Sequence, residues 1–305
     1  MQLEGLHHIT AITGDAPRNV EFYARLLGLR MVKKTVNFDQ PDVYHLYYGD
    51  ETGAPGSILT FFEFPDSAPG RAGDGMVHTI QWRVASEDAI AFWHHRLEGA
   101  GVATERDEGF LRFADPEGLA HELVVAGASD APLVAQADDV PAEHALQGFH
   151  GVRAYASDPA RSARLLERLG FTPGETDGSW ILRGAERHAE YRYEAAPGHG
   201  IQSAGTVHHV AWSAADDAEL EAYRGKARDG GAQPTPIIDR QYFHSVYFRE
   251  PSGVLFELAS RDIGFAVDEP EDELGTELKL PPQYEDRRSE LEEALTPLPN
   301  PRALA

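Results

Sequence analysis

The stretch Leu3-Glu4-Gly5-Leu6-His7-His8-Ile9-Thr10 decides the fold, because its pattern returns three more times along the chain. The three later copies are Gly75-Met76-Val77-His78-Thr79, Leu146-Gln147-Gly148-Phe149-His150-Gly151 and Gly205-Thr206-Val207-His208-His209. Each copy reads as a β-strand with apolar residues around the polar ones. Self-similarity of this kind indicates a repeated supersecondary unit. We therefore expect four tandem modules in this chain of 305 residues.

Each module is predicted to contain a strand, a helix and about three further strands. Helical stretches with one apolar face follow the opening strands, at residues 16–27, 88–97, 159–169 and 217–227. Turn signals such as Glu250-Pro251-Ser252-Gly253 precede the last strands. The predicted fold class is therefore α+β, with four tandem βαβββ modules at residues 3–64, 75–126, 146–195 and 205–260.

We expect the modules to fall into two pairs. Residues 1–126 form the N-terminal pair and residues 146–262 the C-terminal pair, and the small, polar and acidic stretch 127–145 links them. Residues 263–305 are acidic and rich in proline. This tail is predicted to be extended, with a short amphipathic helix at residues 286–295 laid on the surface. The alternative for such a composition is disorder.

Composition excludes several classes of function. The chain has no cysteine, which rules out disulfides, thiolate nucleophiles and cysteine-ligated metal sites. A net charge of −23 argues against nucleic-acid binding. No apolar run reaches the length of a membrane span and no signal-like leader opens the chain, so we expect a cytoplasmic protein with no membrane partner.

The acidic balance also has a bearing on the organism. Only four residues are lysine, Lys33, Lys34, Lys226 and Lys279, so arginine carries nearly all the positive charge. An acidic, lysine-poor surface resembles proteins of salt-loving organisms, in which high ionic strength screens self-repulsion. A GC-rich genome is the alternative explanation for the same composition.

His8, His209 and Glu257 are the predicted metal ligands. His8 and His209 occupy the same position in modules one and four, and a carboxylate such as Glu257 is costly to bury in a covered strand without a cation. Because alternate residues of a strand face opposite sides, we expect His8 and Thr10 to share one face, away from Ile9. The same alternation places His209 and Val207 on the concave face and His208 on the opposite one. Phe256 and Leu258 are expected on the helix side of Glu257.

Two histidines and one carboxylate hold non-haem Fe(II) from one side and leave open positions for substrate and dioxygen. The repeat provides an internal control, because Thr79 and Gly151 stand at the histidine positions in modules two and three. Glu122 stands at the position of Glu257 in module two, without imidazole partners. One complete site results, so modules one and four must share a barrel that encloses the metal. Modules two and three should then form a second, metal-free barrel.

Tyr247 is expected to lie directly opposite Glu257. If Pro251-Ser252-Gly253 forms a three-residue hairpin loop, Gly253 takes the left-handed conformation that such loops use. This register brings the Cβ atoms of the two residues to within about 5 Å. The phenol of Tyr247 could then bind a substrate oxygen or pass a proton. A four-residue loop would turn Tyr247 away from the site.

These motifs resemble the vicinal-oxygen-chelate superfamily, which includes glyoxalase I, bleomycin-resistance proteins and extradiol dioxygenases. Across the whole chain the paired histidines and the acidic tail resemble the ring-cleaving dioxygenases that open hydroquinones. The resemblance implies Fe(II), or Mn(II) as the alternative, bound by His8, His209 and Glu257. It also implies catalytic roles for a second set of residues, which are His7, Thr10, His208, Arg240 and Tyr247. The implied partners are a small aromatic diol and O2, and the chain is a candidate homo-oligomer.

Two other functions remain open from the sequence. A glyoxalase-type isomerase or lyase usually takes carboxylate ligands from more than one module, whereas Thr60 holds the position of Glu257 in module one. A binding protein that sequesters a ligand would not need a complete set of two histidines and one carboxylate. The aromatic residues Phe243, Phe248 and Trp180 are interpreted as core residues.

Overall fold

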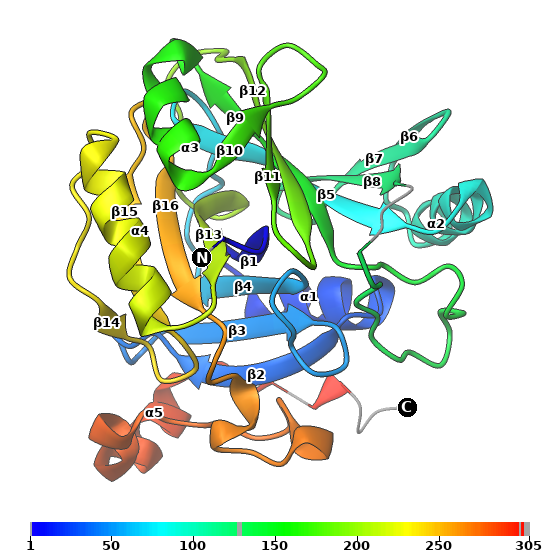
Figure 1. Ribbon diagram of the computed structural model, residues 1–305. Helices are drawn as coiled ribbons and strands as arrows, with labels where there is room; N and C mark the ends of the chain where they lie inside the picture. The colour runs from blue at the N-terminus through cyan, green and yellow to red at the C-terminus, as the bar shows by residue number, and fades with distance from the viewer. Residues whose placement is uncertain (1, 127–129, 299, 302–305) are drawn as a thin grey trace.

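The computed structural model describes residues 2–126, 130–298 and 300–301 and shows four βαβββ modules in sequence (Figure 1). Module one holds β1 (Leu6–Thr13), α1 (Ala16–Val20), the π-helical turn η1 (Glu21–Leu26), β2 (Arg30–Val36), β3 (Tyr44–Gly49) and β4 (Ile58–Glu63). Module two holds β5 (Met76–Val84), α2 (Glu87–Gly99), β6 (Thr104–Asp107), β7 (Phe110–Ala114) and β8 (Ala120–Val125).

The C-terminal half repeats the same order. Module three holds β9 (Phe149–Ala156), the 3-10 turn η2 (Pro159–Ser162), α3 (Ala163–Leu169), β10 (Phe171–Pro173), β11 (Ser179–Arg183) and β12 (His188–Ala195). Module four holds β13 (Thr206–Ala214), α4 (Asp217–Asp229), β14 (Ile238–Asp239), β15 (His244–Arg249) and β16 (Leu255–Ser260). The predicted α+β class and the βαβββ modules are confirmed.

The strands form two eight-stranded sheets, and neither sheet joins module one with module two or module three with module four. The first sheet has the order β14-β15-β16-β13-β1-β4-β3-β2, so modules four and one meet where β13 pairs antiparallel with β1. The second has the order β10-β11-β12-β9-β5-β8-β7-β6, which joins modules three and two through β9 and β5. The predicted pairing of the first module with the last is confirmed.

Each opening strand carries a β-bulge at its first histidine. The pairing register skips His7 in β1 and His208 in β13, and it skips His78 and His150 at the matching place in the second sheet. A bulge inserts one extra residue and re-aims the neighbouring side chains. All four modules therefore interrupt the strand at the same point, next to the position where a metal ligand could stand.

The bulge at His208 corrects one prediction from strand alternation. Val207 packs in the main apolar core with Val210 and Trp212, whereas His208 lies on the concave side with His209. The expectation that Val207 would share the face of His209 is wrong, because the extra residue shifts the alternation by one position. The expected faces of His8, Thr10 and Ile9 are confirmed, since Ile9 is in the core and the other two line a concave pocket.

The tail is folded against module one. It contains η3 (Phe265–Val267), η4 (Glu271–Glu273), η5 (Pro282–Arg287) and α5 (Arg288–Ala294), and Figure 1 shows it beneath β2 and β3. Leu291 and Leu295 are buried, which confirms the amphipathic helix and makes the alternative of disorder wrong for the described part of the tail. The fully buried Lys33 of β2 pairs with Asp268, at 2.6 Å, and with Glu269. None of the helices in the described part of the chain is long and apolar enough to span a bilayer.

Candidate metal centre

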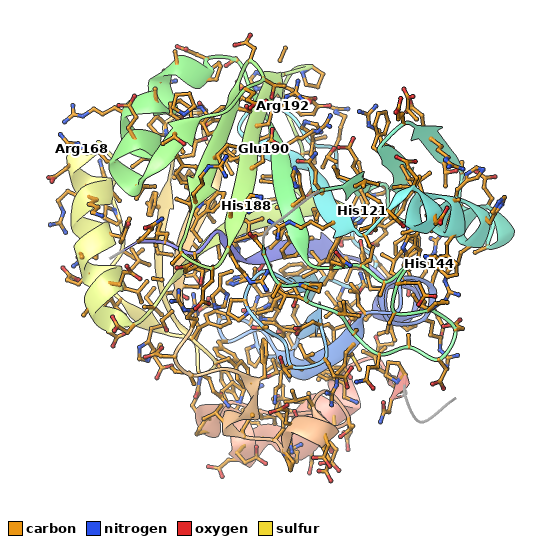
Figure 2. All side chains as sticks on the ribbon, turned by 45° about the vertical axis from the view of Figure 1, so that its right-hand side comes forward. His121, His144, Arg168, His188, Glu190 and Arg192 are labelled. Carbon is orange, nitrogen blue, oxygen red and sulfur yellow. The ribbon has the colours of Figure 1, made fainter. Side chains whose placement is uncertain are left out.

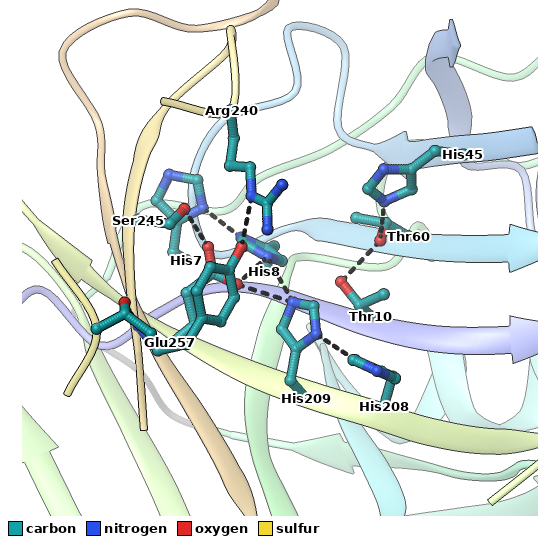
Figure 3. Close-up of polar contacts among 12 residues, drawn as sticks. His7, His8, Thr10, His45, Thr60, His208, His209, Arg240, Ser245 and Glu257 are labelled. Carbon is teal, nitrogen blue, oxygen red and sulfur yellow. Dashed lines mark hydrogen bonds and ion pairs between the residues drawn. The ribbon is translucent and has the colours of Figure 1, made fainter. Parts of the chain in front are cut away.

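His8, His209 and Glu257 converge at the middle of the first sheet, from β1, β13 and β16 (Figure 3). The Nε2 atom of His8 lies 3.2 Å from Nε2 of His209 and 3.2 Å from Oε2 of Glu257. His209 Nε2 and Glu257 Oε2 are 2.8 Å apart. All three side chains are buried, and Glu257 is fully inaccessible to solvent. Three ligand-type atoms therefore surround one point inside the protein.

This triangle fits a metal ion better than a hydrogen-bonded cluster. Two ligands at right angles, each about 2.1 Å from one ion, are themselves about 3 Å apart, which matches all three edges. Oε2 of Glu257 makes no well-aligned hydrogen bond within the described residues, despite its 2.8 Å contact with His209. A buried carboxylate oxygen that faces two imidazole nitrogens in this way could hold a metal ion together with them.

The bulged histidines fix the tautomers of the candidate ligands. His7 Nε2 lies 3.1 Å from the carbonyl oxygen of Ser260, so His7 donates there and its Nδ1 accepts from His8 Nδ1, at 2.9 Å. The Nε2 atom of His8 then carries no proton, so its lone pair is available to a metal ion. Burial, followed by the charge of His8, lowers the pKa of His7 to about 3, so this imidazole stays neutral. The neighbour of each candidate ligand thus orients it, as is usual for metal-binding histidines.

His208 performs the same task for His209. The two Nδ1 atoms are 2.8 Å apart, and burial, followed by the charge of His209, lowers the pKa of His208 to about 3. A neutral His208 that accepts at Nδ1 carries its proton on Nε2. Because His208 lines the concave pocket, this N–H is available to a bound ligand.

The electrostatics of Glu257 favour its ionised form. Burial alone would raise the pKa of this carboxyl, but its contacts with the imidazoles of His8 and His209 outweigh burial and hold its pKa well below the usual range. Ser245 donates a hydrogen bond to the other carboxylate oxygen, Oε1. One oxygen of Glu257 therefore accepts a hydrogen bond from Ser245 on β15, and the other faces His8 and His209.

A pocket of about 300 Å³ opens onto His8 and His209, at the small end of the range for small-molecule sites. Its walls are largely aromatic. The lining residues are His8, Thr10, Asn37, Phe38, Asp39, His45, Tyr47, Phe62, Phe64, His208, His209, Arg240, Phe243, Tyr247 and Leu255. Phe243, which we interpreted as a core residue, both packs in a small core cluster and contacts the rings of His7 and His8.

Tyr247 and Arg240 lie on one wall of the pocket. Tyr247 pairs directly with Glu257 across β15 and β16, and Gly253 in the loop has φ 115°, which confirms the predicted three-residue hairpin. Burial, followed by the charge of Glu257, raises the pKa of Tyr247. Arg240 Nε lies 3.3 Å from the Tyr247 hydroxyl, and its Nη1 lies 3.2 Å from a carboxylate oxygen of Asp39 at the pocket mouth. Tyr247 is thus a phenol beside a fixed positive charge.

The sequence interpretation missed His45 and Tyr47, which line the same pocket from β3. Thr10, which was predicted, also lines the pocket and lies 2.8 Å from Thr60, oxygen to oxygen. The alternation in Tyr44-His45-Leu46-Tyr47 could have indicated that His45 and Tyr47 share a face. That β3 reaches the metal centre depends on how far the sheet curls, which the alternation does not indicate.

The chain matches the model of the Glyoxalase/Bleomycin resistance protein/Dioxygenase superfamily over residues 5–123 and 148–258. It belongs to this superfamily. Among curated relatives, the Bacillus subtilis protein named "Putative ring-cleaving dioxygenase MhqO" is 39% identical, over 96% of each chain. The chlorohydroquinone/hydroquinone 1,2-dioxygenase of Sphingobium indicum is 32% identical, over 95% of each chain. The resemblance proposed from the histidine motifs is confirmed, and the relatives confirm the expectation that this superfamily member is an enzyme.

Solved structures support the same assignment. The crystal structure of a "putative dioxygenase" from Bacillus subtilis superposes with a TM-score of 0.90 at 38% identity, over 98% of each chain. Glyoxalase I from Zea mays superposes with a TM-score of 0.59 at 16% identity, over 85% of this chain and 92% of that one. The second likeness concerns the fold alone.

Proposed function

We propose that the protein is a ring-cleaving dioxygenase that opens hydroquinone-type aromatic diols with O2 at an Fe(II) ion held by His8, His209 and Glu257. The observation that carries this proposal is the ligand triangle, with edges of 2.8–3.2 Å, at the base of an aromatic pocket sized for a single ring. The hydroquinone dioxygenase named among the relatives supports the substrate class. Mn(II) is the alternative metal, and a catechol is the alternative diol.

A bound Fe(II) ion would polarise the diol oxygen and allow electrons to pass from the ring to dioxygen. The protein's own residues bind and orient the diol. The Tyr247 hydroxyl and the Nε2–H of His208 can each donate a hydrogen bond to the substrate oxygen that faces the ligand triangle. The guanidinium of Arg240 beside Tyr247 stabilises negative charge that develops on oxygen. The rings of Phe62 and Phe243 exclude water from the space between.

A glyoxalase-type lyase fits the site less well. The place of a second carboxylate ligand is taken by Thr60, whose hydroxyl bonds to Thr10 and His45 rather than facing the triangle. The residue ranges 1–126, 127–145, 146–262 and 263–305 as domains, the cytoplasmic location and the homo-oligomeric state stay predictions. Residues 127–129, 299 and 302–305 lie outside the described part of the chain.

The test is metal analysis of protein purified without oxygen, followed by oxygen uptake with hydroquinone and catechol side by side. We expect about one iron per chain, uptake with hydroquinone, and a ring-opened product. Uptake with catechol alone would overturn the substrate assignment. No uptake with either diol in iron-loaded protein would overturn the dioxygenase proposal itself.

A further inference from the structure

A hydrogen-bonded group of four side chains, the His45 cluster, lies at the side of the pocket away from Glu257. It consists of Thr10, His45 and Tyr47, which line the pocket, and of Thr60 behind them. Thr10 and Thr60 are 2.8 Å apart, oxygen to oxygen, and Thr60 lies 2.9 Å from His45 Nε2. The Tyr47 hydroxyl lies 2.8 Å from His45 Nδ1. The ligand triangle uses none of these atoms.

The cluster and the triangle occupy different strands of the same curved sheet. Glu257, His209 and His8 stand on the consecutive strands β16, β13 and β1, and the next strands are β4 with Thr60 and β3 with His45. Because neighbouring strands are about 4.8 Å apart, His45 is anchored about 10 Å from His8 along the sheet. Figure 3 shows His45 and Thr60 on the opposite side of His8 from Glu257. Both ends of the pocket are therefore polar.

The wall between them is apolar. The Phe62 ring lies 4.3 Å from the His45 ring, centroid to centroid, and 5.6 Å from that of His208, so it spans the distance between the two polar ends. Burial, followed by the charges of His8 and His209, holds the pKa of His45 well below its usual value. A neutral imidazole between two hydroxyls can carry its proton on either nitrogen. The cluster can thus present Tyr47 as a donor or as an acceptor.

We propose that the His45 cluster binds the second hydroxyl of a para-diol, the hydroxyl that points away from the metal ligands. This inference rests on the proposed function and deepens it. A vicinal diol can place both oxygens at the ligand triangle, so its far side is apolar and makes no hydrogen bond with the cluster. A para-diol places one oxygen at each end of the ring. The cluster therefore selects hydroquinones over catechols and over phenols without a para hydroxyl.

The experiment compares equilibrium binding of hydroquinone and 4-methylphenol to iron-loaded protein without oxygen. The two ligands have nearly the same shape, and only the first has a second hydroxyl. We expect the unmodified protein to bind hydroquinone about tenfold tighter or more, because the methyl group of the analogue makes no hydrogen bond with the cluster. In His45→Phe the ratio of the dissociation constants of 4-methylphenol and hydroquinone should fall to about 1, with unchanged iron content. His45→Gln should restore part of this ratio.

His78→Phe is the matched control, since it removes a half-buried strand histidine from the second sheet and should leave the ratio intact. If His45→Phe does not fold, Tyr47→Phe makes the same test and should also lower the ratio. A ratio that stays unchanged in the folded His45 or Tyr47 variant overturns the inference. Equal binding of both ligands by the unmodified protein also overturns it, even if oxygen uptake occurs. Selective binding without oxygen uptake overturns the dioxygenase proposal and leaves the cluster's role standing.

Discussion

The two eight-stranded sheets carry a glutamate at the same strand position but surround it differently. Glu257 pairs with Ala211 across the parallel strands β16 and β13, and Glu122 pairs with Gln81 across β8 and β5. Glu257 faces two imidazoles. The carboxylate of Glu122 instead accepts hydrogen bonds from three side chains, which are Gln81 at 2.7 Å, Arg112 at 2.7 Å and Arg153 at 2.6 Å.

The two sheets differ in the space around the histidine position as well as in charge. Gly151 stands where the first sheet has a histidine, and a Cβ atom there would lie 2.2 Å from the carbonyl oxygen of Glu190 on β12. No side chain fits at that distance without a backbone shift. Glu190, labelled in Figure 2, pairs with Gly151 across β12 and β9. The second sheet therefore neutralises its buried glutamate with the guanidinium groups of Arg112 and Arg153, whereas in the first sheet the glutamate faces the two imidazoles of the candidate metal centre.

The largest difference between the sheets should appear in metal binding. Glu257→Gln removes one of the three candidate ligands, so we expect metal affinity and activity to fall at least about 100-fold, more than loss of an outer partner causes. Glu122→Gln is the matched variant and should keep full metal content and activity. Metal analysis and oxygen uptake measure both. Full metal occupancy in Glu257→Gln, or loss of iron in Glu122→Gln, would show that the metal has been assigned to the wrong sheet.

Glu122→Gln should instead reduce stability. The substitution leaves Arg112 and Arg153 without their buried carboxylate, and Arg112 is 39% exposed, so water compensates part of the loss. We expect the free energy of unfolding to fall by about 2–3 kcal/mol. Denaturant titration of metal-free protein measures this change. Unchanged stability would show that these ion pairs only offset the hydration that the charged groups lose on folding.

Acidification should also lower stability through the buried His121, which precedes Glu122 in β8. Burial lowers the pKa of His121 to about 3, whereas in the unfolded chain an imidazole takes up its proton near pH 6.5. Between these values the unfolded state binds more protons, so stability falls as the pH falls. The loss from this group is about 2 kcal/mol from pH 7 to pH 5.

Asp115, whose pKa is raised by burial to about 6, acts in the opposite direction below that pH. The informative quantity is therefore the difference in pH dependence between the unmodified chain and His121→Gln, measured by denaturant titration at pH 7 and pH 5. The variant should lose less stability on acidification. Identical pH dependence would mean that His121 becomes protonated in the folded protein.

Salt concentration should have the smallest effect on stability and should not distinguish the two sheets. The chain has a net charge of −23, and dissolved ions screen the repulsion among its negative charges. We expect the melting temperature to rise by several degrees between low and molar salt, at about 2–4 °C per kcal/mol gained. A constant melting temperature would favour a GC-rich genome as the source of the acidic composition.

Local sequence patterns were sufficient for much of the fold. The repeated opening motif, the helical periodicities and the Pro-Ser-Gly turn predicted the modules and the register that sets Tyr247 opposite Glu257. These features depend on neighbouring residues and on backbone preferences that a short segment carries with it. The pairing of the first module with the last also followed, since one metal site cannot draw ligands from two separate barrels.

Other features required the tertiary structure. Strand alternation placed His208 on the wrong face, because a bulge depends on how two distant strands pair. The arginines that hold Glu122 come from β7 and β9, and His45 reaches the pocket only because the sheet curls.

The amino-acid sequence by itself thus determined the units of this protein and the residue types at its candidate metal centre. That Arg112 and Arg153 hold the other glutamate, Glu122, was decided only when strands remote in sequence became neighbours. The physical reason is that burial makes a carboxylate's partner obligatory, while the identity of that partner depends on long-range packing.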